Sequence, residues 1–125
     1  MGLAIAVDSG GSAYVAGMTN TPDFPTTPGV IKSKPALGES PLPFLAKFKP
    51  DGSDFAYSTY LGSKSTGILA LALDAAGNAY VTGSNIWGTF PTKDPLQEYS
   101  NNSDVVVAKV NTTGTALLFS HLPWR

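Results

Sequence analysis

The sequence predicts an all-β fold built from two copies of one four-stranded unit, and three observations support this. Residues 3–17 are repeated with the same spacing at 69–83. Each copy begins with a short run in which alanine alternates with a larger aliphatic residue, which is the period of a strand. Glycine and proline are frequent, 13 and 10 in 125 residues, as expected of a chain with many turns.

The two copies match position by position beyond these first runs. The shared residues are Asp8, Gly11, Tyr14 and Gly17 in the first copy and Asp74, Gly77, Tyr80 and Gly83 in the second. The same register continues to Phe-Pro-Thr at 24–26 and 90–92. A fixed period of roughly 60–66 residues indicates a repeat architecture.

Helix propensity alone points the other way for the run at 69–73, because leucine and alanine are good helix formers. The matching run at 3–7 carries β-branched Ile5 and Val7 where the second copy has leucine. One structure must suit both copies, and a short strand closed by an Asp-x-x-Gly turn does so. We expect both strands to be buried on both faces, with one neighbour close to the alanines.

Eight strands are expected, and each unit is an antiparallel meander. They are 3–7, 13–16, 44–48 and 55–61 in the first unit, and 69–73, 79–82, 105–110 and 117–122 in the second. Successive connections of a meander alternate between its ends, so the tight turns share one end and the long connections 18–43, 62–67 and 84–104 share the other. The turn glycines Gly11, Gly52, Gly77 and Gly114 are expected to have positive φ.

Repeated four-stranded units of this kind are typical of β-propeller blades. Residues 1–65 would form the first blade and 66–125 the second, with strands 3–7 and 69–73 innermost, near the propeller axis. Because a propeller closes with about 4–8 blades, two blades make a propeller fragment with two uncovered faces. Apolar side chains such as Ile5, Val15, Leu71 and Val81, or their strand neighbours, would line those faces.

A resemblance to a known family is carried by four segments. They read Ala-Ile-Ala-Val-Asp-Ser-Gly-Gly-Ser-Ala-Tyr-Val-Ala-Gly, Asp-Phe-Pro-Thr-Thr-Pro-Gly, Phe-Leu-Ala-Lys-Phe and Tyr-Ser-Thr-Tyr-Leu-Gly. Together they resemble the bacterial SBBP repeat of seven-bladed β-propellers over nearly the whole chain. The resemblance implies an extracellular or cell-surface repeat protein without catalytic residues, although the chain shows no signal peptide. The second copy departs from the pattern at 120–125.

Composition excludes several classes of partner. A formal net charge of −1 provides no basic field for nucleic acid or an anionic membrane. There is no cysteine for a disulfide or a thiolate metal site, and no apolar run reaches the roughly 20 residues of a membrane span. We therefore expect no nucleic-acid partner, no membrane insertion and no cofactor. The expected partners are further blades, either of a longer chain or of other copies of this one.

Candidates for chemistry are few. Asp8 and Asp74 could bind a metal on a repeated scaffold, but repetition favours side chains that hold their own turns. His121 is the only histidine, and no Gly-x-Ser-x-Gly motif of a serine hydrolase is present. We therefore predict that the chain has no catalytic residues and no metal ligands.

Residues that occur in one copy only, on the long connections, are the better candidates for ligand contact. They are Trp87, Lys93, Asp94 and Tyr99, followed by Lys32, Lys34 and Glu39. Trp87 and Tyr99 could stack on a glycan or a peptide, or could close a small core over the blade. The sequence thus predicts a non-catalytic structural or interaction module that presents a loop-rich face to a protein or glycan. The alternative is part of a propeller lyase or hydrolase that acts on polysaccharide from the same face.

Overall fold

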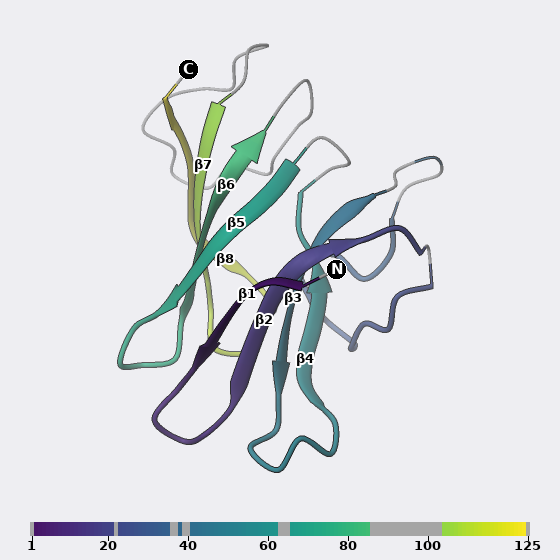
Figure 1. Cartoon of the computed structure of the whole chain (residues 1–125), viewed down its shortest axis with the longest axis vertical. Coiled ribbons are helices and arrows are strands. Elements are labelled where there is room, and N and C mark those ends of the chain that lie inside the picture. The colour runs from purple at the N-terminus through teal and green to yellow at the C-terminus, as the bar shows by residue number, and fades with distance from the viewer. Residues whose placement is uncertain are drawn as a thin grey trace.

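The computed structural model describes residues 2–21, 23–35, 38, 41–62, 66–85 and 104–124. They form two four-stranded antiparallel sheets, each in simple chain order, as Figure 1 shows. The first sheet contains β1 (Gly2–Val7), β2 (Ala13–Thr19), β3 (Leu42–Phe48) and β4 (Phe55–Tyr60). The second contains β5 (Thr66–Leu73), β6 (Ala79–Asn85), β7 (Asp104–Val110) and β8 (Leu117–Trp124). The all-β class and the eight expected strands are confirmed, and several strands are longer than expected.

The repeat in the sequence is a repeat in the structure. In both sheets a tyrosine of the second strand lies opposite an alanine of the first strand and a lysine of the third. The two sets are Ala6, Tyr14 and Lys47, and Ala72, Tyr80 and Lys109. A bulge interrupts the first strand pair of both sheets at matching positions. Equivalent residues therefore lie on equivalent faces of the two sheets.

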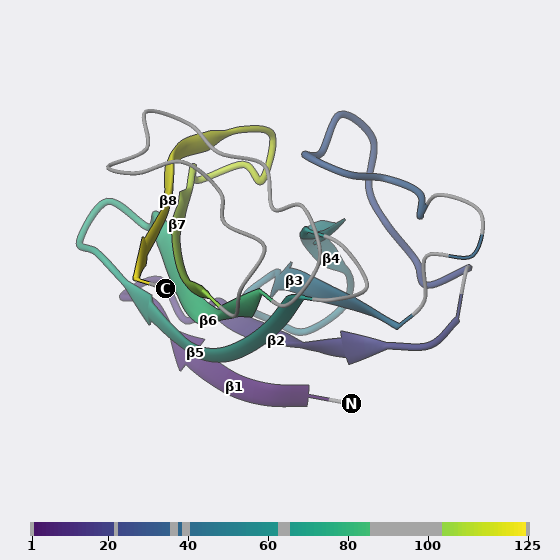
Figure 2. The same cartoon turned by 90° about the horizontal axis from the view of Figure 1, so that it is seen from above.

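The core lies between the sheets, which pack face to face. The strand β5 contacts β1, β2 and β3, and Figure 2 shows it running alongside β2. The first sheet contributes Tyr14, Ala16, Leu45 and Tyr57, and Leu61 directly after β4 joins them. The second sheet contributes Ile68, Ala79, Val81, Ala108 and Val110. All ten are at most 2% exposed. Burial of this apolar surface, at about 25 cal/mol per Å², is what joins the two sheets.

The expectation that the first strand of each unit is buried on both faces is wrong. In β1, Leu3, Ile5 and Val7 are 42%, 68% and 62% exposed. In β5 it is the alanines, Ala70 and Ala72, that are exposed. The reason is that β1 and β5 each have one face toward the other sheet and one open face, and alternation along a strand sends successive side chains to opposite faces.

The open faces carry only part of the residue set expected for them. Ile5 and Val15 do lie on the open face of the first sheet. Leu71 and Val81 instead face the first sheet, and Val81 is only 1% exposed. Their strand neighbours, among them Ala72, line the open face of the second sheet in their place.

The tight turns are built as the sequence indicates. Gly11, Gly52, Gly77 and Gly114 have φ of 89°, 73°, 89° and 71°, which confirms the expected positive values. In Figure 1 the turns that follow β1, β3 and β5 lie at the lower end. At Gly52 an added Cβ would meet nothing within 4 Å, whereas at Gly114 it would overlap the ring of Tyr57. The turn after β7 is therefore pressed directly against the first sheet.

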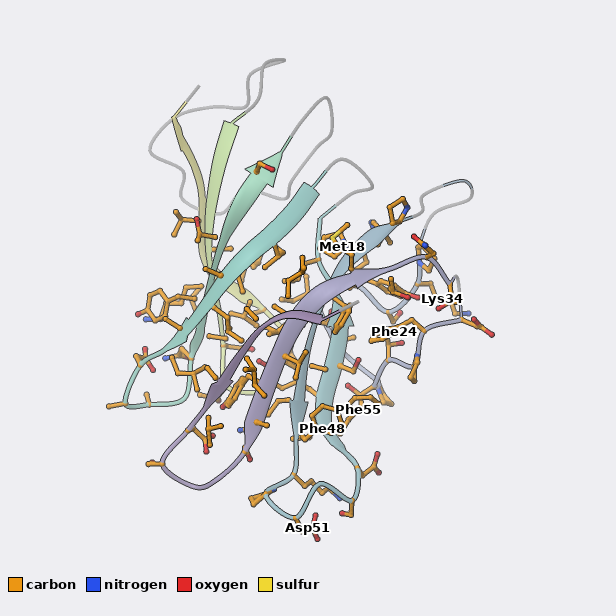
Figure 3. The ribbon with its side chains drawn as sticks, viewed as in Figure 1. Met18, Phe24, Lys34, Phe48, Asp51 and Phe55 are labelled. Atoms are coloured by element: carbon orange, nitrogen blue, oxygen red, sulfur yellow. The ribbon has the colours of Figure 1, made fainter. Side chains whose placement is uncertain are left out.

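The connection after β2 runs along the outer edge of β4. The backbone N–H of Thr27 donates to the Ser58 carbonyl at 3.1 Å, and the N–H of Tyr60 donates to the Lys32 carbonyl at 2.9 Å. The ring of Phe24, labelled in Figure 3, lies 4.5 Å from that of Phe44. Residues 27–32 thereby satisfy backbone groups at an edge that would otherwise face solvent.

The described residues form strands, turns and irregular segments. No helix long and apolar enough to span a membrane occurs among them.

Candidate functional site

The four residues predicted to contact a ligand, Trp87, Lys93, Asp94 and Tyr99, lie outside the described residues, as does Glu39. Lys34 is exposed, and Figure 3 places it on the connection after β2. Lys32 serves the fold, because its Nζ donates to the Gly62 carbonyl at 2.9 Å and its backbone N–H donates to Thr59 Oγ1 at 3.0 Å.

Among the described residues, ionisable side chains gather in one three-residue cluster per sheet. These Asp–Tyr–Lys clusters consist of Asp8, Tyr14 and Lys47, and of Asp74, Tyr80 and Lys109. In the first cluster the Tyr14 hydroxyl donates to Asp8 Oδ2 at 3.0 Å, and Lys47 Nζ lies 3.9 Å from the same oxygen. The corresponding distances in the second cluster are 3.3 Å and 3.7 Å. Each lysine also lies over the tyrosine ring, at 5.2 Å and 5.3 Å from its centroid.

The second carboxylate oxygen of each aspartate holds its own turn. Asp8 Oδ1 accepts from the N–H groups of Gly10 and Ser12 at 3.0 Å and 2.9 Å. Asp74 Oδ1 accepts in the same way from Ala76 and Asn78. The interpretation of both aspartates as turn-holding residues agrees with this geometry.

These contacts fix the protonation states. The hydrogen bond from the Ser12 backbone, more than any other, lowers the pKa of Asp8. The pKa of Asp74 falls to about 2, chiefly through the hydrogen bond from the Asn78 side-chain amide. Burial, followed by the hydrogen bond to Asp8, raises the pKa of Tyr14 to about 12. At neutral pH the carboxylates are thus ionised and Tyr14 is protonated. The pKa values of these groups lie far from 7, whereas general acid–base catalysis at neutral pH needs a group with a pKa near 7.

The clusters are also unsuited to binding a metal. Each carboxylate is already matched by a lysine ammonium group, whose positive charge opposes a cation at the same oxygen. Within the described ranges, no three His, Cys, Asp or Glu side chains gather into a set that could hold a metal ion.

Tyr14 links the two sheets as well as holding its own turn. Its hydroxyl lies 3.3 Å from the carbonyl oxygen of Gly77, in the turn between β5 and β6. The ring packs edge-on against Tyr57, with the centroids 6.4 Å apart. Sequence reasoning missed this cluster as a unit, because the lysine comes from β3, far along the chain. The available signal was the lysine repeated in Ala-Lys-Phe and Ala-Lys-Val.

The two buried tyrosines should respond in opposite ways to loss of the hydroxyl. Tyr14→Phe removes hydrogen bonds to Asp8 and Gly77 and is expected to lower the free energy of unfolding by about 1–2 kcal/mol. The Tyr57 hydroxyl is buried without a hydrogen-bond partner in the described part of the chain, so Tyr57→Phe should be neutral or stabilising by up to about 1 kcal/mol. Urea unfolding followed by circular dichroism measures both. A greater loss in Tyr57→Phe than in Tyr14→Phe would contradict the assignment.

The open sheet faces are the other candidate surfaces, and each carries an open apolar hollow. The hollow on the first sheet is lined by Gly2, Leu3, Ala4, Ile5 and Val15. The hollow on the second is lined by residues 70–72 and 80–82 and by Val107. Leu3, Ile5 and Val7 of β1 are exposed together, which makes the open face of the first sheet a candidate contact surface.

Comparison with known proteins finds no matching protein-family model and no matching curated protein. The features of the described residues that bear on function are the internal repeat, the two stacked sheets, the two structural Asp–Tyr–Lys clusters and the two open faces.

Proposed function

We propose that this chain is a non-catalytic structural and interaction module, formed by two blades of a β-propeller. The observation that carries the proposal is the stacking of two equivalent four-stranded meanders, face to face and with matching register. Stacked four-stranded sheets of this kind are the building principle of propellers. The resemblance to the bacterial SBBP repeat supports the same conclusion and an extracellular or cell-surface location.

The absence of suitable chemistry in the two clusters favours a scaffold over an enzyme. Asp8, Tyr14 and Lys47 recur as Asp74, Tyr80 and Lys109 in the same geometry, and both sets hold turns and strands together. A catalytic site is needed once, whereas a structural device is needed in every repeat. We therefore assign the clusters to the stability of each blade.

We expect the partner to bind at the end of the blades where the long connections lie. Binding residues are found disproportionately on loops held by a rigid scaffold. Trp87 and Tyr99, both in the connection between β6 and β7, have flat rings with a polar edge that suit stacking on a sugar. We propose a glycan as the ligand of this end.

The test is binding of the chain to an immobilised array of bacterial and plant glycans, together with a reducing-end assay on the same polysaccharides. We expect binding to at least one glycan, no release of new reducing ends, and a loss of binding of at least tenfold in Trp87→Ala and Tyr99→Ala. Lys49→Ala, at the opposite end, is the control and should bind as the wild type does. New reducing ends would favour the lyase or hydrolase alternative. An array without a bound glycan would overturn the glycan assignment.

A further inference from the structure

Each sheet has two chemically different faces, and each kind of face occurs twice. The first kind, here called the alanine face, carries Ala4, Ala6, Tyr14 and Ala16 on the first sheet and Ala70, Ala72, Tyr80 and Thr82 on the second. The second kind, the aliphatic face, carries Ile5, Val7, Ala13 and Val15 on the first sheet and Leu71, Leu73, Ala79 and Val81 on the second. The shared register makes these residues equivalent.

Among the residues that the structure describes, one face of each kind is used inside the chain. The alanine face of the first sheet packs against the aliphatic face of the second, and this contact forms the core. Among the described residues, the β1–β2 part of the aliphatic face of the first sheet and the alanine face of the second remain open. On the β3–β4 part of that aliphatic face, Ala46 and Ser58 are at most 2% exposed. The open surfaces are therefore equivalent, residue for residue, to parts of the two faces that pack together inside the chain.

The exposed fractions of equivalent side chains differ strongly between the two aliphatic faces. Val81 is 1% exposed and Leu71 packs against the core, whereas Ile5 is 68% and Val7 62% exposed. Covering the open face as its counterpart is covered would remove these side chains from water. The open alanine face offers the matching half, because its small side chains let an aliphatic face approach closely.

A hydrogen bond crosses the internal interface, and both of its partners have equivalents outside it. The Tyr14 hydroxyl of the alanine face lies 3.3 Å from the Gly77 carbonyl of the opposing unit. Tyr80 occupies the place of Tyr14, and Gly11 occupies that of Gly77, with the same φ of 89°. Both turns are held by an aspartate Oδ1 in the same way. A copy docked as the sheets are docked would bring its Gly11 carbonyl to the Tyr80 hydroxyl.

We propose that a second copy of this chain docks head to tail on these surfaces, its open aliphatic face on the open alanine face of the first. The proposal rests on the proposed function, since it extends the stacking of blades from one chain to the next. Such a contact is heterologous, so it repeats until a ring closes. Because propellers close with about 4–8 blades and each chain supplies two, closure takes two, three or four copies.

The experiment uses the whole chain and one blocking variant for each face. Ile5→Lys places a charge on the open aliphatic face and Ala72→Lys places one on the open alanine face; both positions are exposed, so both variants should fold. In sedimentation velocity the wild type should form a discrete assembly of two to four copies, and each variant alone should sediment as a monomer of 13.0 kDa. An equimolar mixture of the two variants should give a dimer, because one intact face remains on each.

The matched control is Leu118→Lys. Leu118 is 43% exposed, and its counterpart in the first sheet, Ala56, stays exposed although the alanine face beside it is covered. This variant should assemble as the wild type does. Circular dichroism of every variant checks that the sheets are intact.

Three results would overturn the proposal: a wild type that stays monomeric at all concentrations, assembly of either blocked variant by itself, or a mixture without the dimer. Assembly that is lost equally in Leu118→Lys would count against it as well. A monomeric wild type that still binds glycan through Trp87 and Tyr99 would overturn the docking of copies while leaving the proposed function in place.

Discussion

Gly114→Ala is expected to lower the free energy of unfolding by about 3 kcal/mol or more, whereas Gly52→Ala should cost only about 1 kcal/mol. The two glycines occupy equivalent turns and have nearly the same φ, 71° and 73°, so the backbone strain of an alanine is the same at both. They differ in what surrounds them. A Cβ at Gly52 points into open space, whereas a Cβ at Gly114 would overlap the buried ring of Tyr57.

Urea unfolding of both variants, followed by circular dichroism, isolates the contribution of packing between the sheets. The difference between the two losses reports the overlap with Tyr57, because the common strain cancels. Combining Gly114→Ala with Tyr57→Leu, which gives the new methyl group more room, should reduce the penalty of the alanine. Equal losses at Gly52 and Gly114 would show that the turn after β7 is not pressed against the first sheet.

Gly83→Ala should be at least as damaging, with a loss of about 3–4 kcal/mol or a failure to fold. Gly83 pairs with Ile68 beside the bulge of the β5–β6 pair. A Cβ on Gly83 would overlap the backbone carbonyl of Gly67 and lie 2.9 Å from Cα of Ile68. Backbone atoms in a ladder cannot swing aside as a flexible side chain does, so β5 would have to separate from β6 locally.

The control for this variant is Gly67→Ala, on the other strand of the same pair. There a Cβ would meet only Ser84 Oγ, at an ordinary contact distance of 3.8 Å. We expect a change within about 1 kcal/mol, because replacing a strand glycine also restricts the unfolded chain. Thermal unfolding of the two variants makes the comparison. A Gly83→Ala protein as stable as Gly67→Ala would rule out the close backbone approach at the bulge.

The elements could be predicted because the repeat removes ambiguity from local patterns. The run at 69–73 is compatible with helix or strand when read alone, and its partner at 3–7 decides for strand. The positive φ of Gly77 could be predicted for the same reason, since Gly11 occupies the same place in the other copy. Local turn chemistry and period-two alternation were sufficient to predict most of the strands and turns.

The orientation of the sheets could not be predicted in the same way. Alternation divides Leu71 and Ala72 between two faces but does not say which face meets the other sheet, because both are apolar. The cluster of Asp8, Tyr14 and Lys47 depends on strand pairing across a long connection, which no local pattern encodes. The predicted contact residues on the connection between β6 and β7 remain a prediction.

Residues 27–32 cover the outer edge of β4, and this cover affects the tendency of the protein to aggregate. A free strand edge is a template on which other chains add strands, and continued addition grows fibrils. The sequence of β4, Phe-Ala-Tyr-Ser-Thr-Tyr, is aromatic, uncharged and free of proline, which is the composition that favours such growth. The backbone hydrogen bonds from Thr27 to Ser58 and from Tyr60 to Lys32 already engage the edge of β4, so its backbone groups there are not available to another chain. A fluctuation that detaches the segment would therefore expose the edge of β4 as a template for fibril growth.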